Sequence, residues 1–265
     1  MAECDLMLRQ SDKFFWHGYV DFYNTFLPAN IKGHIIEFGV FNGHSIRWLM
    51  EKYPESEITG VDILETRQEW PVCNRVHYAC LDQGHDGAIA SFFEDMDAPD
   101  LIIDDGSHIP SHQSRCLKYG FRKLKSGGIY ILEDIHTSFP SHDLFKKEFG
   151  AKHRFLRRNQ RRGGIRRVQT ALSILLAFDQ IKRNGNKALT AAHLDRLAVA
   201  GPFSRDDVVF MFENIASIHV YKRATLPSAC FSCGAEIFDY LEFKCVCGEE
   251  LLSLADSMSV LICKA

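Results

Sequence analysis

The sequence of 265 residues has no run of about 18 or more consecutive apolar residues, the length that a membrane-spanning helix needs. Its first residues, Met-Ala-Glu-Cys-Asp, lack the basic region and apolar stretch of a secretory signal peptide, so we expect a cytoplasmic protein. A net charge of −3 gives no sign of nucleic-acid binding. Internal repeats and low-complexity tails are also missing, and the length allows one large domain, alone or with a small appendage.

Nine cysteines are present, an odd number that, without a secretory signal, indicates reduced thiols. Four of them form the pattern C-x₂-C-x₁₁-C-x-C, with a glycine after each pair: Cys230, Cys233, Cys245 and Cys247. Four thiolates suit tetrahedral structural Zn²⁺, although the second pair has one intervening residue instead of two. We therefore expect a zinc-ribbon-like, Cys4 zinc-knuckle insertion over residues 225–256. The alternative is a set of unmetallated, partly buried cysteines.

Short apolar segments alternate with amphipathic ones through the first half of the chain. This alternation predicts an α/β fold with a mostly parallel sheet and helices on both faces, and ligands then bind beyond the carboxyl ends of the strands. The expected strands are 34–40, 57–63, 76–81, 100–104 and 129–133, with helices at 45–53, 87–95 and 111–125. Two later strands are expected at 215–223 and 258–264.

The flanking segments are assigned by the same patterns. Residues 13–27 are aromatic and helix-periodic up to Pro28, so residues 1–33 are expected to form a helical cap, with a substrate lid or an oligomer interface as alternatives. Residues 34–224 and 257–265 would form the Rossmann-like domain. Within it, residues 151–205 would hold a basic loop and helices at 168–182 and 190–200.

A cofactor site is predicted at three consecutive strand ends. The first strand ends in Glu37-x-Gly39-x-x-x-Gly43, where glycines let a ligand approach the backbone. Asp62 ends the second strand and can accept hydrogen bonds from ribose hydroxyls, and Asp82-Gln83 follow the third strand and can bind an adenine amino group. The alternative is that these are ordinary turn glycines and helix caps. The full set of candidates is Glu37, Gly39, Asn42, Gly43, Ser45, Asp62, Ile63, Asp82, Gln83 and Asp104.

A second site is predicted where the next two strands end. Asp105 follows one strand and Glu133-Asp134 follow the other, and neighbouring parallel strands lie about 4.8 Å apart. Three carboxylates that close would repel one another unless a cation neutralised them, and hard oxygen ligands suit Mg²⁺. Such a metal would orient a hydroxyl and lower its pKa, and His108 could remove its proton. Helix capping by these acids, with His108 on the surface, is the alternative.

Two further residues have less defined places near this site. Strand alternation sends the Asp104 side chain to the face opposite Asp105, so Asp104 is expected to support the site from behind. His136 follows the last of these strands and is a candidate for substrate contact.

These motifs resemble the macrocin and mycinamicin O-methyltransferases, which methylate sugar hydroxyls of macrolide antibiotics. The resemblance covers roughly residues 30–140 and is carried by Glu37-Phe38-Gly39-Val40, Gly60-Val61-Asp62-Ile63, Ile103-Asp104-Asp105-Gly106-Ser107-His108 and Gly127-Gly128-Ile129-Tyr130-Ile131-Leu132-Glu133-Asp134. It implies a class I methyltransferase sheet with an antiparallel last strand, S-adenosylmethionine around Glu37, Gly39, Asp62 and Asp82, Mg²⁺ on Asp105, Glu133 and Asp134, and His108 as the base. The acceptor would be a sugar of a glycosylated natural product or a glycan.

An arginine-rich run departs from the family: Lys152, Arg154, Arg157, Arg158, Arg161, Arg162, Arg166 and Arg167. It fits a solvated or gating loop, an anionic substrate, RNA, an acidic membrane surface or a partner subunit. Two other functions stay open. One is an RNA-binding methyltransferase that grips phosphates with these arginines and the zinc knuckle, and the other is a hydroxylase-type or non-methylating relative.

Overall fold

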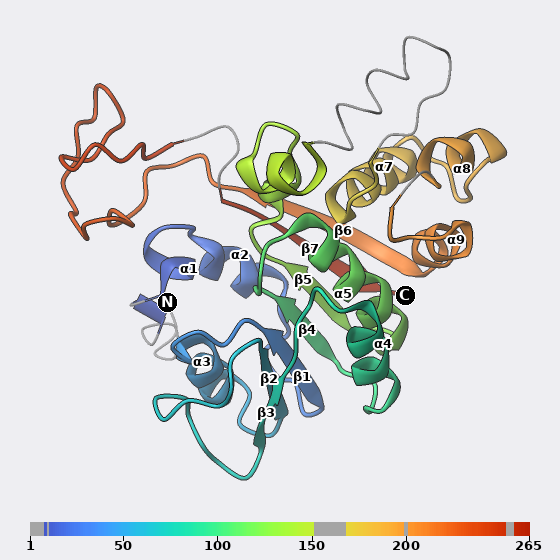
Figure 1. Cartoon of the computed structure of the whole chain (residues 1–265), viewed down its shortest axis with the longest axis horizontal. Helices are drawn as coiled ribbons and strands as arrows, with labels where there is room; N and C mark the ends of the chain where they lie inside the picture. The colour runs from blue at the N-terminus through green and yellow to red at the C-terminus, as the bar shows by residue number, and fades with distance from the viewer. Residues whose placement is uncertain (1–7, 10, 151–167, 199–200, 253–256) are drawn as a thin grey trace.

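The chain folds around a seven-stranded sheet in the order β3-β2-β1-β4-β5-β7-β6 (Figure 1). The computed structural model describes all residues except 1–7, 10, 151–167, 199–200 and 253–256. The first five strands pair in parallel and β7 runs antiparallel to both of its neighbours, which confirms the Rossmann-like class I methyltransferase sheet. The strands are β1 (His34–Phe38), β2 (Glu57–Asp62), β3 (Val76–Cys80), β4 (Leu101–Asp104), β5 (Ile129–Leu132), β6 (Ile215–Lys222) and β7 (Met258–Lys264).

Two hydrophobic cores cover the two faces of the sheet. One face packs against the helices α4 (Asp86–Glu94), α5 (Pro110–Lys123), α7 (Ala171–Arg183) and α9 (Arg205–Asn214). The other face packs against α2 (Tyr19–Phe26) and α3 (His44–Lys52). The strand side chains alternate between the faces, so Ile35 joins the second core and Ile36 the first, and both are fully buried.

The aromatic N-terminal segment forms two helices rather than the single helix expected over 13–27. Helix α1 spans Asp12–Phe15 and is capped by the Ser11 side chain, and α2 begins after Gly18. Gly18 has a φ of 70°, in the left-handed region, which ends the first helical segment and redirects the chain. The break places α1 beside the carboxyl ends of the strands.

Beyond residue 167, the described part of the chain contains the helices α7, α8 and α9 and the antiparallel pair β6 and β7. Helices were expected at 168–182 and 190–200, and α7 and α8 (Ala191–Leu197) occupy those places. Helix α9 was not expected, although Ser204 and Asp207 form a capping box at its start. The arginine-rich run at 151–167 lies outside the described residues. In the described part of the chain, no helix has the length and apolar character needed to cross a bilayer.

Candidate active site

A cavity of about 610 Å³ opens at the carboxyl ends of β1, β2, β4 and β5, and α1 forms part of its wall. Most of the predicted site residues line it. The lining includes Gly39, Asn42, Ser45, Asp62, Ile63, Asp82, Gln83, Asp105, His108, Glu133 and Asp134. Of the residues predicted to bind cofactor, Mg²⁺ or substrate, four are not in the lining, namely Glu37, Gly43, Asp104 and His136.

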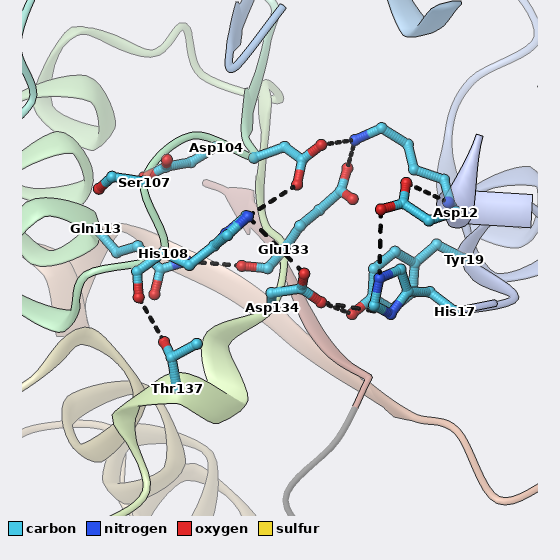
Figure 2. Close-up of polar contacts among 12 residues, drawn as sticks. Asp12, His17, Tyr19, Asp104, Ser107, His108, Gln113, Glu133, Asp134 and Thr137 are labelled. Carbon is cyan, nitrogen blue, oxygen red and sulfur yellow. Dashed lines mark hydrogen bonds and ion pairs between the residues drawn. The ribbon is translucent and has the colours of Figure 1, made fainter. Parts of the chain in front are cut away.

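Asp105, His108 and Asp134 converge at one end of the cavity. Their nearest ligand atoms lie within 4.8 Å of one another, and Figure 2 shows His108 directed toward the carboxylates. His108 Nε2 is 3.8 Å from Asp105 Oδ1 and 3.9 Å from Asp134 Oδ2. The β4–β5 register produces this arrangement, because Asp104 pairs with Leu132 and the next residues on both strands leave the sheet together.

The loops that carry these residues are held in an uncommon backbone conformation. His108 has a φ of 53° and Asp134 a φ of 50°, both in the left-handed region that non-glycine residues seldom adopt. Thr137 donates a hydrogen bond to the His108 carbonyl at 2.7 Å, and the Gln113 amide donates to the Glu133 carbonyl at 2.6 Å (Figure 2). Strained residues maintained by such contacts are concentrated at functional sites.

Lys13, which was not among the predicted site residues, lies at the centre of the acidic cluster. Its Nζ atom is 2.5 Å from Asp105 Oδ2, 2.5 Å from Glu133 Oε1 and 3.6 Å from Glu37 Oε1. The Lys13 side chain is only 5% exposed. Lys13 therefore engages Glu133 and one oxygen of Asp105, both predicted Mg²⁺ ligands. The other Asp105 oxygen lies with His108 and Asp134 in the group that could hold a metal ion.

Burial dominates the electrostatics of this cluster. It raises the pKa of Asp105, and burial together with the nearby Asp105 carboxylate raises the pKa of Glu133 well above its ordinary value. Burial also raises the pKa of Glu37 to about 7. Burial alone would lower the pKa of Lys13, but the carboxylates of Asp105, Glu133 and Glu37 outweigh it, and the net shift is upward. Three acidic groups around one ammonium repel one another when ionised, so a further bound cation would favour their ionised forms.

Asp134 has a different environment, because donors surround it. Tyr19 donates a 2.6 Å hydrogen bond to Oδ1, and His17 Nδ1 lies 3.5 Å from the same oxygen (Figure 2). Burial opposes ionisation of Asp134, but the nearby His17, His108 and His136 outweigh burial, so its pKa is lowered. Asp134 is therefore the carboxylate that stays ionised most readily. His136 lies beside it, with Nδ1 3.8 Å from Oδ1, and away from the cavity lining.

The predicted cofactor end is lined by Asp62 and Asp82. Asp62 Oδ2 accepts hydrogen bonds from the amides of Val40 and Phe41 at 2.9 and 3.2 Å. Asp62 Oδ1 accepts one from Leu64 at 3.0 Å, and Asp82 Oδ1 accepts one from Gly84 at 2.7 Å. These carboxylates thus fix loops and do not cap the neighbouring helices, because the N-caps of α3 and α4 are Gly43 and His85. Each carboxylate oxygen has two acceptor sites, so the residues retain capacity for a ligand hydroxyl or amino group.

Gln83, Asp104 and Glu37 form a supporting layer. Both ends of the Gln83 amide are engaged, because Nε2 donates to Asp104 Oδ1 at 2.9 Å and Oε1 accepts from the Ser107 amide at 2.8 Å. Asp104 is fully buried beside α5, and burial raises its pKa to about 6. Glu37 is also fully buried and accepts from Ser45 Oγ at 2.7 Å. These hydrogen bonds fix the positions of the residues at the strand ends.

Two other predicted features have clear positions. Gly43 has a φ of 72° and immediately precedes α3, where it shapes the turn after β1. The four clustered cysteines come together between β6 and β7, with their sulfur atoms all within 4.8 Å of one another.

The curated relatives of this chain act on sugar hydroxyls. The chain is 31% identical over 139 residues to the 8-demethyl-8-alpha-L-rhamnosyl tetracenomycin-C 2'-O-methyltransferase of Streptomyces olivaceus, covering 49% of this chain and 36% of that protein. It is 31% identical over 142 residues to the L-olivosyl-oleandolide 3-O-methyltransferase of Streptomyces antibioticus, with the same two coverages. It is 25% identical over 134 residues to the mycinamicin VI 2''-O-methyltransferase of Micromonospora griseorubida, covering 47% of this chain and 33% of that protein. Over about half of its length the chain is similar to these O-methyltransferases.

The extent of this relationship is limited. The chain spans about a third of the length of the curated relatives it matches. No protein-family model matches it. Among solved structures, MycE methyltransferase from the mycinamycin biosynthetic pathway, in complex with Mg and SAH, superposes on all of this chain and on 55% of its own chain, with a TM-score of 0.60 and 17% identity. That likeness establishes the shared fold.

Proposed function

We propose that this protein is an S-adenosylmethionine-dependent, Mg²⁺-assisted O-methyltransferase that acts on a sugar hydroxyl of a glycosylated natural product or glycan. The observation that carries the proposal is the group of Asp105, His108 and Asp134 at the end of a cavity that also contains the predicted cofactor residues. The named acceptors of the relatives, rhamnosyl and olivosyl compounds, support a deoxysugar-bearing acceptor.

The donor set suits Mg²⁺. Asp105 and Asp134 offer hard carboxylate oxygens near the open cavity, and Glu133 would join them when its ammonium partner withdraws. Mg²⁺ would supply a Lewis acid that lowers the pKa of a coordinated hydroxyl. S-adenosylmethionine would supply a methyl group on a positively charged sulfur, and Gly39, Asp62 and Asp82 line the part of the cavity proposed to hold it.

His108 is proposed to be the general base. His108 would accept the hydroxyl proton as the acceptor oxygen takes the methyl group, and S-adenosylmethionine would keep on its sulfur the electron pair of the broken carbon–sulfur bond. The orientation of Nε2 toward Asp105 and Asp134 supports this role, because the acceptor hydroxyl would be held between the carboxylates and the imidazole. The two carboxylates would also stabilise the protonated imidazole.

Other parts of the proposal concern the remaining metal and the location. The Cys4 cluster is proposed to hold structural Zn²⁺, because four thiolates leave no open position for a substrate. A cytoplasmic location is also proposed. The free thiols among the described cysteines are consistent with it.

Two measurements test the proposal. Isothermal titration with S-adenosylmethionine should show binding, and absence of binding would favour a non-methylating protein. The protein should then be incubated with S-adenosylmethionine, Mg²⁺ and a panel of rhamnosyl and olivosyl compounds. Mass spectrometry should show that an acceptor compound gains about 14 Da, the difference between a methyl group and a hydrogen atom. Methylation of RNA and not of any sugar would contradict the proposal.

A further inference from the structure

The segment between β6 and β7, which we call the Cys4 module (residues 225–252), packs against α1 in the cavity wall. Its small hydrophobic cluster consists of Cys230, Phe238, Cys245 and Leu251 together with Trp16, the residue that follows α1. Trp16 is only 7% exposed, so the module and the N-terminal segment share one core. The colours of Figure 1 show that these two segments come from opposite ends of the chain.

The four sulfur atoms have the spacing of a tetrahedral metal site. Cys230 and Cys247 sulfurs are 3.7 Å apart, and Cys233 and Cys245 sulfurs are 3.4 Å apart. Sulfurs bound at about 2.3 Å to one tetrahedral Zn²⁺ lie about 3.8 Å apart, whereas a disulfide requires about 2.05 Å. The observed distances therefore match four ligands around a common centre.

The two cysteine pairs sit on equivalent turns despite their different spacing. Gly234 N–H donates to the Cys230 carbonyl at 2.8 Å, and Gly248 N–H donates to the Cys245 carbonyl at 2.8 Å. The Cys230 N–H donates to the Ala235 carbonyl, and the Cys245 N–H donates to the Glu249 carbonyl. Gly234 and Gly248 have φ values of 72° and 93°, which close both turns after the second cysteine. The shorter second spacing thus forms a turn that presents both of its sulfurs to the centre.

Hydrogen bonds attach the module to the end of α1. The Phe15 carbonyl, at the last residue of α1, accepts from Ser228 N–H at 2.9 Å and from Ser228 Oγ at 3.1 Å. Phe231 of the module packs on Trp16 with ring centroids 5.9 Å apart, and the Arg223 guanidinium lies 4.5 Å from the Trp16 ring centre. Phe231 also lines the cavity, so the module forms part of the wall itself.

We propose that Zn²⁺ bound by Cys230, Cys233, Cys245 and Cys247 folds the Cys4 module, and that the folded module holds α1, and with it Lys13, in the wall of the active site. The module is shorter than the about 40 residues below which domains usually need a metal or disulfides. Its metal would therefore provide its folding energy. Removing zinc would release Trp16 and loosen the side of the cavity that carries Lys13 and His17, while the cofactor end formed by β2 and β3 would stay in place.

Zinc content and hydrogen exchange test this inference on the full chain. Elemental analysis by mass spectrometry should find one zinc per chain in protein purified without chelators, and none in the double variant Cys233→Ser, Cys247→Ser. Hydrogen exchange of peptides covering residues 11–17 should be at least about tenfold faster in that variant, whereas peptides covering β1 and β4 should be unchanged. Absence of zinc, iron in its place, or unchanged exchange at residues 11–17 would overturn the proposal.

Two further variants separate docking from metal binding. Trp16→Ala should keep its zinc but show the faster exchange at residues 11–15, because it removes the shared core without touching a ligand. Phe243→Ala is the matched control, since Phe243 is a 51% exposed aromatic of the same module that does not line the cavity, and it should change neither zinc content nor exchange. Faster exchange in Phe243→Ala equal to that in Trp16→Ala would contradict the docking role.

This inference rests in part on the proposed function, because the position of α1 affects catalysis only if the cavity binds an acceptor. The two fail separately, however. Loss of S-adenosylmethionine binding in zinc-loaded wild-type protein would refute the methyltransferase proposal and leave the zinc result standing. Zinc-free wild-type protein that still binds S-adenosylmethionine would refute the present inference alone.

Discussion

Lys13 Nζ lies 2.5 Å from Asp105 Oδ2, which joins the N-terminal helix to the residue expected to hold Mg²⁺. The same ammonium group contacts Glu133, so one buried cation neutralises part of the acidic cluster in the metal-free protein. A lysine at this position would compete with a divalent ion for the same carboxylate oxygens. The interaction also links the position of α1 to the charge of the active site.

Replacing this cation should have opposite effects on stability and on metal affinity. In Lys13→Met, we expect the metal-free protein to lose about 3 kcal/mol of unfolding free energy, because buried carboxylates lose their partner. Mg²⁺ should bind at least about tenfold more tightly, because one nearby positive charge is gone. Chemical denaturation with EDTA and isothermal titration with MgCl₂ measure the two effects. Lys32→Met, which removes only an exposed pair with Glu55, is the control and should change neither. Weaker Mg²⁺ binding in Lys13→Met would contradict the competition.

The role of His108 as a base predicts a loss confined to turnover. We expect His108→Gln to reduce kcat by about 10²–10⁴-fold, the range typical of a positioned base, with little change in the Kd of S-adenosylmethionine. His77→Gln removes an exposed histidine paired with Glu57 and should have wild-type kinetics. A kcat in His108→Gln within about twofold of wild type would show that the proton leaves by another route.

The raised pKa of Glu37 predicts a pH-dependent stability difference. The native state holds the Glu37 proton up to a pKa of about 7, whereas the unfolded chain releases it near 4.5, so stability is lost as the pH rises between these values. Glu37→Gln should therefore gain about 3 kcal/mol over wild type at pH 8 and almost nothing at pH 4 in metal-free protein. Urea denaturation at both pH values measures this. A gain of equal size at both would show that Glu37 does not titrate as described.

Phe231 provides a prediction about the acceptor. It is 58% exposed at the cavity wall, on the side of Trp16 and His17, where an aromatic ring can pack on a sugar. Phe231→Ala should raise the acceptor KM about tenfold, an effect of about 1.4 kcal/mol, and leave the Kd of S-adenosylmethionine unchanged. Steady-state kinetics with each substrate varied in turn distinguish the two. An increased Kd for S-adenosylmethionine with an unchanged acceptor KM would contradict the prediction, because it would show that Phe231 contacts the cofactor and not the acceptor.

Much of the fold and part of the site follow from local sequence patterns. The parallel strands were predictable because β1, β4 and β5 are short, mostly apolar and buried, and acidic residues stand at or directly after the ends of β4 and β5. Parallel pairing then brings those ends to one edge of the sheet, which is why Asp105, His108 and Asp134 could be grouped in advance. The Cys4 cluster was visible for the same reason, since its ligands are close in sequence.

Lys13 could not be predicted, because its environment is tertiary. It follows Ser11 and Asp12 in an aromatic segment, and nothing local indicates that a lysine there is buried among acids that are distant in sequence. The break at Gly18 was also missed, since the apolar periodicity continues across it. Helix α9, which was not predicted, has a readable signal in the sequence, because the Ser204 and Asp207 capping box stands before an apolar run.

Asp105 provides the most direct test of metal-assisted methyl transfer. Methylation of 8-demethyl-8-alpha-L-rhamnosyl tetracenomycin C, or of another acceptor found by the screen, should be measured in wild-type and Asp105→Ala protein, each with MgCl₂ and with EDTA. We predict turnover only in wild-type protein with MgCl₂, and S-adenosylmethionine binding in all four samples. Full turnover in Asp105→Ala, or in wild-type protein with EDTA, would contradict the account.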